Sequence, residues 1–247
     1  MADAVIRFEN VYKSFGAHKV LENVSFEVPR GSALCILGRS GTGKSVTIKQ
    51  MIGLIKPDSG HIYVEGRDVT AMNAAELSRV RRRIGFLFQY SALFDSISVG
   101  ENVAFPLRRH TNLEEDEIRD VVEKKLARVG LRGIYDKMPS QISGGMQKRV
   151  GLARALALDP PILLADEPSS GLDPITSQEI DELLLDLKHT EHTTMVVVTH
   201  NIPSARRIGD EIAVLEGGRI LDRGSPADLE QSEHAIVREF MTLEGGI

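Results

Sequence analysis

The sequence of 247 residues contains one cysteine, Cys35, and no tryptophan. A single thiol cannot form a disulfide within the chain, so the sequence excludes a disulfide-rich secreted scaffold and favours a reducing compartment. Its longest apolar runs are only a few residues long, far below the ~20 residues that a membrane-spanning helix needs. The first residues also lack the basic, apolar and small-residue succession of a secretory signal. Any role at a membrane therefore requires a partner that spans it.

Excess positive charge is absent too. The formal net charge is −5, from 30 Lys and Arg against 35 Asp and Glu, which argues against nucleic acid as a partner. The sequence shows no internal repeat, low-complexity segment or long linker. Because 42% of the residues are hydrophobic, the chain can bury a sizeable core, and we expect a single domain over residues 1–247.

Four short runs of nearly continuous apolar residues are typical of strands covered on both faces in a parallel sheet. They are residues 33–37, 84–88, 162–165 and 195–198. Apolar residues at helical spacing follow in 118–129 and 180–187. Near the N-terminus, 5–11, 21–28 and 60–69 predict further strands, and 211–224 predicts a hairpin that turns at Gly217 and Gly218. The chain therefore has the pattern of an α/β fold.

A polar feature follows each of the four buried runs. The first leads into the glycine-rich stretch 38–45, the second into Gln89, the third into Asp166 and Glu167, and the fourth, after Thr199, into His200. Ligands of open α/β sheets bind beyond the carboxyl ends of the strands. We therefore expect these four features to form one site.

The stretch "GRSGTGKS" fits the phosphate-binding loop pattern G-x-x-x-x-G-K-[ST], with a strand before it and a helix after it. Glycines let backbone N–H groups approach an anion, and the helix start adds its positive end. We predict that Lys44 bridges the β- and γ-phosphates of ATP and that the Ser45 hydroxyl binds Mg²⁺. The predicted nucleotide contacts are Gly38, Arg39, Ser40, Gly41, Thr42, Gly43, Lys44, Ser45 and Val46.

Two adjacent acids end the third buried run, in "ILLADE". We assign Asp166 to Mg²⁺ and Glu167 to the general base that polarises the attacking water. His200, at the end of another strand, is a candidate contact to the γ-phosphate. Gln89 alone is uninformative.

A second glycine motif, "ISGGMQKR", opens the helical stretch 146–158. Ser143 suits a helix N-cap, and Gly144 and Gly145 permit the close approach of an anion. Because the chain already has one phosphate loop, this second anion site requires another nucleotide or another subunit.

These motifs, with "SSGLD" at 169–173, occur in the order found in ATP-binding cassette (ABC) ATPases, which the sequence resembles over nearly its whole length. The resemblance implies a P-loop NTPase with a RecA-like parallel core sheet, an antiparallel β-subdomain and a helical insert at about residues 90–160. It implies a head-to-tail homodimer in which each ATP lies between the phosphate loop of one subunit and the signature loop, "ISGGM" at 142–146, of the other.

The resemblance also assigns roles to residues. Lys44, Gln89, Glu167 and His200 are implied as catalytic, and Ser45, Gln89 and Asp166 as Mg²⁺ ligands. Ser143, Gly144, Gly145 and Asp173 would contact nucleotide across the dimer interface. Phe15 matches the position that stacks on adenine, and nearby Tyr12 is the alternative.

One departure narrows the resemblance. The common signature has Gln where this chain has Met146, and a thioether cannot replace an amide's hydrogen bonds. Met146, the stretch 88–108 and "HTN" at 110–112 together resemble ATPases of Mla-type and Mce-type lipid transporters. This resemblance implies an integral membrane permease, docked around residues 91–108, and a lipid-binding accessory protein. It also implies a peripheral location on the cytoplasmic face of the inner (plasma) membrane. Phe94 and Leu107 are candidate contacts to the permease if their side chains face it and not the core.

Other functions remain open on the sequence alone. The chain could serve an importer of a small polar solute, act as a soluble non-transport cassette ATPase, or bind nucleotide without hydrolysing it. The single cassette argues against the second, and Glu167 argues against the third.

Overall fold

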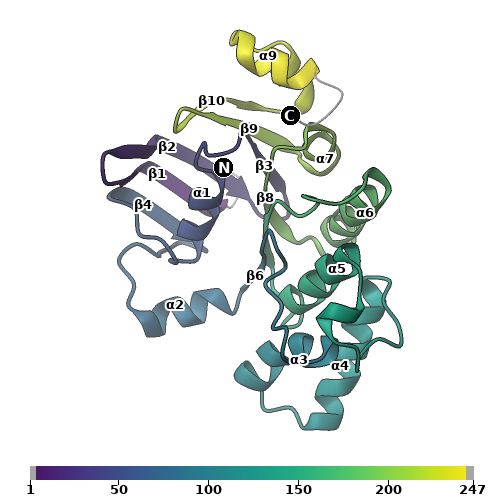
Figure 1. Ribbon diagram of the computed structural model, residues 1–247. Helices are drawn as coiled ribbons and strands as arrows, with labels where there is room; N and C mark the ends of the chain where they lie inside the picture. Colours follow the sequence, from purple (N-terminus) through teal and green to yellow (C-terminus); the bar gives the residue numbers. More distant parts are fainter. Residues whose placement is uncertain (1–3, 243–247) are drawn as a thin grey trace.

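The computed structural model describes residues 4–242, which form two sheets flanked by helices (Figure 1). The predicted domain's ends, 1–3 and 243–247, lie outside the described residues. The smaller sheet is antiparallel, in the order β2-β1-β4-β5. Its strands are β1 (Ala4–Phe15), β2 (His18–Pro29), β4 (Ser59–Val64) and β5 (Arg67–Asp68).

The larger sheet contains the four buried runs that the sequence predicts as strands. Its order is β10-β9-β3-β8-β7-β6, and every neighbouring pair is parallel except the hairpin β9–β10. The strands are β3 (Ala33–Leu37), β6 (Ile84–Leu87), β7 (Ile162–Asp166), β8 (Thr194–Thr199), β9 (Glu211–Glu216) and β10 (Arg219–Gly224). The predicted α/β architecture with an N-terminal antiparallel subdomain is confirmed.

The helices cover both faces of this sheet and extend below it (Figure 1). They are α1 (Lys44–Met51), α2 (Ala74–Arg81), α3 (Val99–His110), α4 (Glu115–Arg128), the short 3₁₀ helix η1 (Pro139–Gln141), α5 (Gly144–Ala155), α6 (Pro174–Glu191), α7 (Ile202–Ile208), α8 (Pro226–Glu230) and α9 (Ala235–Thr242).

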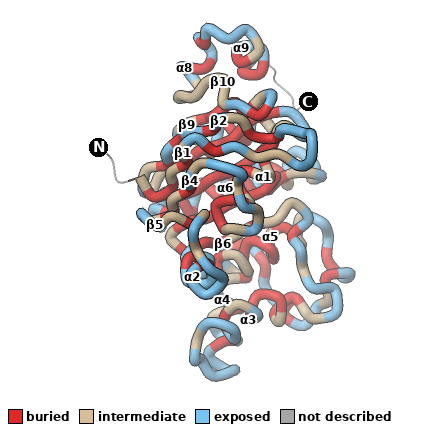
Figure 2. The backbone as a smooth tube through the Cα atoms, turned by 90° about the vertical axis from the view of Figure 1, so that its left-hand side faces the viewer, coloured by how far each residue is buried: buried red, intermediate tan, exposed pale blue. Residues whose placement is uncertain are grey.

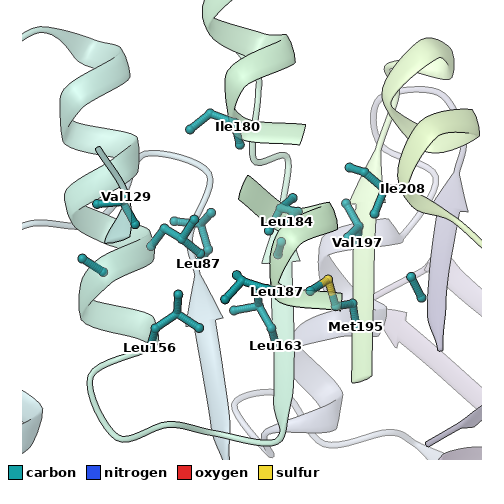
Figure 3. Close-up of a cluster of buried hydrophobic side chains, with 14 of the residues drawn as sticks. Leu87, Val129, Leu156, Leu163, Ile180, Leu184, Leu187, Met195, Val197 and Ile208 are labelled. Carbon is teal, nitrogen blue, oxygen red and sulfur yellow. The ribbon is translucent and has the colours of Figure 1, made fainter. Parts of the chain in front are cut away.

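The central sheet has an apolar cluster on each face because successive side chains of a strand point to opposite sides. On one face, Leu163, Met195 and Val197 pack with Leu184 and other side chains of the helices (Figure 3). On the other face, alternate strand residues pack toward α1 and the antiparallel sheet; they are Leu34, Ile36, Leu164, Val196 and Val198. This two-sided burial explains why the strands read as continuous apolar runs.

The helices α3, α4 and α5 lie together at the end of the molecule opposite α9 (Figures 1 and 2). These three helices contact one another, and buried and exposed residues alternate along them (Figure 2). Val103, Ile118, Val122 and Leu126 lie in this contact and are each no more than 2% exposed. Within residues 4–242, no helix combines the length and apolar character needed to cross a bilayer.

Candidate functional site

The phosphate loop runs from the end of β3 into α1, and its backbone requires glycine at particular positions. Gly41 and Gly43 have φ of 82° and 105°, a conformation that L side chains rarely adopt. At Gly38, an added Cβ would lie 2.3 Å from the carbonyl oxygen of Leu215. Gly43 is also the N-cap of α1, so the positive end of that helix points toward the loop.

Lys44, the first residue of α1, is buried beneath this loop with 6% of its surface exposed. Its Nζ donates to the carbonyls of Gly38 at 2.7 Å and Arg39 at 2.9 Å, and lies 3.6 Å from Glu167 Oε1. Burial lowers the pKa of Lys44, and the Glu167 carboxylate opposes that shift. The ammonium is therefore held by two backbone carbonyls of the loop, next to the place where phosphates would bind.

Ser45 and Asp166 meet at the ends of α1 and β7. The Ser45 hydroxyl donates to Asp166 Oδ1 at 2.8 Å, and Lys49 Nζ lies 4.0 Å from Oδ2. Burial raises the pKa of Asp166, opposed by the hydrogen bond from Ser45. A hydroxyl beside a carboxylate suits Mg²⁺, which takes oxygen ligands and uses few protein groups when phosphates supply the rest. Within residues 4–242, no group of three His, Cys, Asp or Glu side chains is placed to hold a metal ion. A metal bound here would therefore need ligands from the phosphates as well.

Glu167 follows β7 directly, in a backbone conformation with φ of 49°. Positive φ is uncommon outside glycine and often marks functional sites. Its amide donates to the Val198 carbonyl at 2.9 Å. Its carboxylate lies 2.9 Å from His200 Nδ1 and accepts from the Thr199 hydroxyl at 3.3 Å. The structure therefore brings together the acid after β7, the histidine after β8 and the lysine of the phosphate loop.

These residues line one cleft of about 800 Å³. Its walls include the predicted residues Phe15, Arg39, Ser40, Gly41, Gly43, Lys44, Ser45, Val46, Gln89, Glu167 and His200. The predicted residues Gly38, Thr42 and Asp166 are not wall residues, but each is hydrogen-bonded to one: Gly38 to Lys44, Thr42 to Arg39 and Asp166 to Ser45.

Two wall residues, His18 and Val20, are not predicted by the sequence motifs. They reach the cleft because the β1–β2 hairpin pairs Phe15 with His18. Phe15 is 51% exposed and lines the cleft, whereas Tyr12, 41% exposed, is not among its wall residues. The position of Phe15 favours it over Tyr12 for adenine.

The signature loop and Asp173 are not part of this cleft. Ser143 caps α5, accepting from the Met146 amide at 3.3 Å, and α5 starts at Gly144, two residues earlier than the sequence pattern suggests. Asp173 caps α6, and its hydrogen bond from the Thr176 hydroxyl lowers its pKa. Ser143, Gly144 and Asp173 are exposed, as expected for groups that meet another molecule.

Met146 is partly buried and packs against the apolar cluster that includes the helices. A thioether is suited to that environment. The neighbouring Gln147 instead donates its amide to the Pro139 carbonyl at 3.0 Å. The substitution of Met for the usual Gln is therefore accommodated by packing within the chain.

A second hollow of about 640 Å³, here called the phenylalanine groove, lies between the central sheet and α3. Its walls include Phe86, Phe88, Phe94 and Phe105, with a cationic rim of Arg81, Arg82, Arg109 and Arg154. The rings of Phe94 and Phe105 are 5.1 Å apart and are 44% and 49% exposed. Leu107 is only 3% exposed and packs in the core, because it lies on the side of α3 opposite Phe105. The condition set for it, that its side chain faces a partner and not the core, is therefore not met.

Comparison with known proteins gives a family and named relatives. A family model described as ABC transporter matches residues 21–170. The probable ribonucleotide transport ATP-binding protein mkl of Mycobacterium tuberculosis is 45% identical over 236 residues, which cover 96% of this chain and 66% of that protein. The chain thus spans slightly less than two thirds of this relative's length.

The intermembrane phospholipid transport system ATP-binding protein MlaF of Escherichia coli is 40% identical over 226 residues, covering 92% of this chain and 84% of MlaF. Among solved structures, the dimeric post-hydrolysis state of the ATP-binding cassette MJ0796 bound to ADP and Pi matches with a TM-score of 0.83 and 35% identity. That match covers 89% of this chain and 98% of the other.

Proposed function

The chain belongs to the ABC transporter family, and from that premise we propose that it is the ATP-hydrolysing subunit of a transporter for phospholipid or a related lipid. The resemblance to this family and the P-loop NTPase fold, both expected from the sequence, are confirmed. The observation that supports hydrolysis most directly is the convergence of Lys44, Glu167 and His200 at the ends of three elements in one cleft.

ATP binds in the cleft with its phosphates against the loop and its adenine against Phe15. Lys44 exchanges its carbonyl partners for the β- and γ-phosphates, since a charge-assisted bond to phosphate is stronger than a bond to a neutral carbonyl. Ser45, Asp166 and Gln89 would hold Mg²⁺, which would neutralise charge on the phosphates. The backbone amides of the loop and the start of α1 add further positive potential.

Glu167 acts as the general base. Its carboxylate orients a water for attack and takes its proton, while His200, 2.9 Å away, fixes the carboxylate and contacts the γ-phosphate. The remaining stabilisation comes from a second copy of the chain, whose Ser143, Gly144, Gly145 and Asp173 complete the site. The exposure of Ser143, Gly144 and Asp173 supports this arrangement, as does the dimeric neighbour with ADP and Pi.

The phenylalanine groove binds an integral membrane permease. Exposed aromatic rings in a concave site are typical of a binding surface, and the arginine rim suits a segment with acidic residues beside apolar ones. The chain would then lie on the cytoplasmic face of the inner (plasma) membrane, with a lipid-binding accessory protein receiving the cargo.

Lipid as cargo is supported by the name of the Escherichia coli relative. A second candidate, import of a polar solute, is supported by the name of the mycobacterial relatives, which refers to ribonucleotide transport. Reconstituting the chain with its co-purifying membrane subunit separates the two. Lipid transport is supported if phospholipid stimulates ATP hydrolysis and labelled phospholipid moves in an ATP-dependent way. Import of a polar solute is supported if only ribonucleotide stimulates ATP hydrolysis.

The chemical proposal is tested with Glu167→Gln. Losing a positioned general base should slow ATP hydrolysis by about 10²–10⁴, while ATP binding persists and a dimer with bound ATP accumulates. Hydrolysis at the wild-type rate would show that Glu167 is not the base.

The assembly is tested in that variant with cysteines at Ser40 and Ser143. Head-to-tail dimers should crosslink between subunits when Mg-ATP is present. The free, buried Cys35 is replaced by Ser, so that only the two introduced thiols can crosslink. Crosslinks confined to one chain would contradict the arrangement.

Docking in the groove is tested with Phe94→Asp, which places a charge on a side chain that is 44% exposed. Co-purification with the permease should be lost while ATP binding remains. Exposed Leu113 lies in the same helical region, is 37% exposed and is not among the groove's wall residues, so Leu113→Asp is the matched control. Equal loss in both variants would contradict docking at the groove.

A further inference from the structure

Lys148 is a buried cation of α5 that belongs to the motif "ISGGMQKR" but has no role assigned from the sequence. Its side chain is only 5% exposed. Its Nζ donates to the carbonyl of Gln89 and, at 3.2 Å, to the carbonyl of Glu167. Gln89 follows β6 and Glu167 follows β7. One ammonium therefore joins two strand ends to the helix that begins at the signature loop.

The segment that Lys148 holds after β6 is a tight turn at residues 88–92. Ser91 and Ala92 have φ of 58° and 48°, and the Ser91 amide donates to the Phe88 carbonyl at 2.9 Å. A left-handed backbone conformation at two consecutive non-glycine residues costs free energy, so surrounding contacts must stabilise the turn. Arg154 supplies such contacts, donating to the carbonyls of Ser91 at 2.6 Å and Ala92 at 2.8 Å.

Gly151 lies between these two cations and allows α5 to approach the turn. A Cβ added there would be 3.1 Å from the Ser91 Cβ and 3.1 Å from a methyl carbon of Leu87. Lys148, Gly151 and Arg154 are spaced three residues apart, so they share one face of α5. That face holds the turn that carries Gln89.

Glu167 is held from several directions. The Glu167 amide donates to the Val198 carbonyl, and His200 and Lys44 contact the Glu167 carboxylate. Its carbonyl accepts from Lys148. Among these contacts, the one from Lys148 is the link to the signature helix. It therefore relates the direction of the Glu167 side chain to the position of α5.

Stability alone does not explain a lysine here. Desolvation lowers the pKa of Lys148, which reflects the free-energy cost of burying its charge. Apolar side chains of similar volume often serve stability equally well at buried charged positions. The specific contribution of the ammonium is that it can bridge two carbonyls on separate strands.

We propose that Lys148 is a positioning residue for ATP hydrolysis: it fixes the Gln89 turn and the Glu167 backbone against the signature helix, so that the Glu167 carboxylate is aimed correctly. This rests on the proposed function. Lys148 does not line the cleft, so its removal affects turnover and leaves nucleotide binding intact.

The test is Lys148→Met, measured as ATP affinity, KM and kcat. We expect kcat to fall at least about tenfold, since a misplacement of about 1 Å can cost ~10² in rate, with Kd and KM for ATP within about twofold of wild type. Lys148→Arg, which keeps the charge and several donors, should recover much of kcat.

A second buried lysine provides the matched control. Lys188 of α6 is 9% exposed, and its Nζ donates to the Ile208 carbonyl at 3.0 Å and to Asp210 at 2.9 Å. Lys188→Met removes a buried ammonium that bonds a backbone carbonyl, as Lys148→Met does, but it should leave kcat near that of the wild type. Equal kcat in the two folded Met variants would overturn the proposal.

Gly151→Ala tests the same contact if Lys148→Met does not fold. The added methyl presses on Ser91 and Leu87, so kcat should fall while ATP affinity stays near wild type. A wild-type kcat in this variant would overturn the proposal.

Glu167→Gln distinguishes a failure of the proposed function from a failure of the role proposed for Lys148. Hydrolysis that is unaffected by Glu167→Gln refutes the proposed function, whereas normal turnover in Lys148→Met, with Glu167→Gln inactive, refutes the role of Lys148 alone.

Discussion

The helices α1 and α5 are built alike but are placed differently. Each begins at a glycine-rich loop, and each carries a buried lysine that donates to two backbone carbonyls. Lys44 is the first residue of α1 and lines the nucleotide cleft, whereas Lys148 lies one turn inside α5 and faces the interior.

The two loops differ in the same way. The phosphate loop is enclosed by walls from its own chain, among them Phe15, Gln89 and His200. Ser143 and Gly144 at the start of α5 are exposed. The difference teaches that one loop forms a site within a single chain, while the other offers the same kind of surface to another molecule.

The largest expected effect separates the two lysines. Lys44→Ala should raise Kd for ATP by about two to three orders of magnitude, because losing one partner of a buried charge pair costs about 2–5 kcal/mol. Lys148→Met should leave Kd near wild type. Thermal stabilisation by Mg-ATP measures both. Undiminished stabilisation of Lys44→Ala would mean that the loop does not hold the phosphates.

The next effect separates the two loops. Ser143→Glu brings a negative charge to the start of α5 and should slow hydrolysis by about 10², the scale of one lost electrostatic contact in a transition state. ATP binding to the single chain should be unchanged. Ser98 caps α3 in the same way, accepting from the Glu101 amide at 3.2 Å, so Ser98→Glu controls for the altered cap. The idea of a second chain is refuted if both variants hydrolyse ATP at the same rate.

A smaller effect on ATP affinity tests which aromatic side chain encloses the phosphate-loop cleft. Phe15→Ala removes an aromatic wall of the cleft and should weaken ATP binding about fivefold to tenfold, near the lower end of the ~1–3 kcal/mol attributed to stacking of one base. Tyr12→Ala, on the same strand but outside the cleft walls, should change Kd less than twofold. The reverse order would assign adenine to Tyr12.

The smallest effect concerns a buried charge outside both helices. Asp181 of α6 is 4% exposed, accepts from the Ser204 hydroxyl at 2.7 Å, and has no partner for Oδ1 among residues 4–242. Burial raises its pKa, opposed by the bond from Ser204. The unfolded state therefore loses this proton at lower pH than the folded state, so the free energy of unfolding falls as pH rises between the two pKa values.

Asp181→Asn removes the titrating carboxyl group and, with it, this fall in the free energy of unfolding. At neutral pH its thermal midpoint should exceed that of the wild type by roughly 2–4 °C, the shift that about 1 kcal/mol produces in a domain of this size. The advantage should disappear once the pH is below the ordinary aspartate pKa of about 3.9. A variant that is less stable than wild type at pH 7 would show that the carboxylate has a partner of its own.

Much of the site could be predicted because its polar residues come directly after apolar strand segments. Residues 33–37 and 162–165 are apolar throughout, so the polar residues after them are visible in the sequence. His18 could not be found in this way, since its place depends on the register of a hairpin. Lys148 and Leu107 depend on which face of a helix meets its neighbours, and local spacing does not fix that where most of α3 and α5 is enclosed.

The strand order has a consequence for how the chain is made. The strand β3, which leads into the phosphate loop, pairs with β8 and β9, which the ribosome completes only at Thr199 and Glu216. The antiparallel strands and the group α3–α5 are each formed from nearer neighbours in sequence and can assemble during synthesis. The phosphate loop is therefore translated well before the strands that flank β3, so a complete nucleotide site requires synthesis to have passed β9.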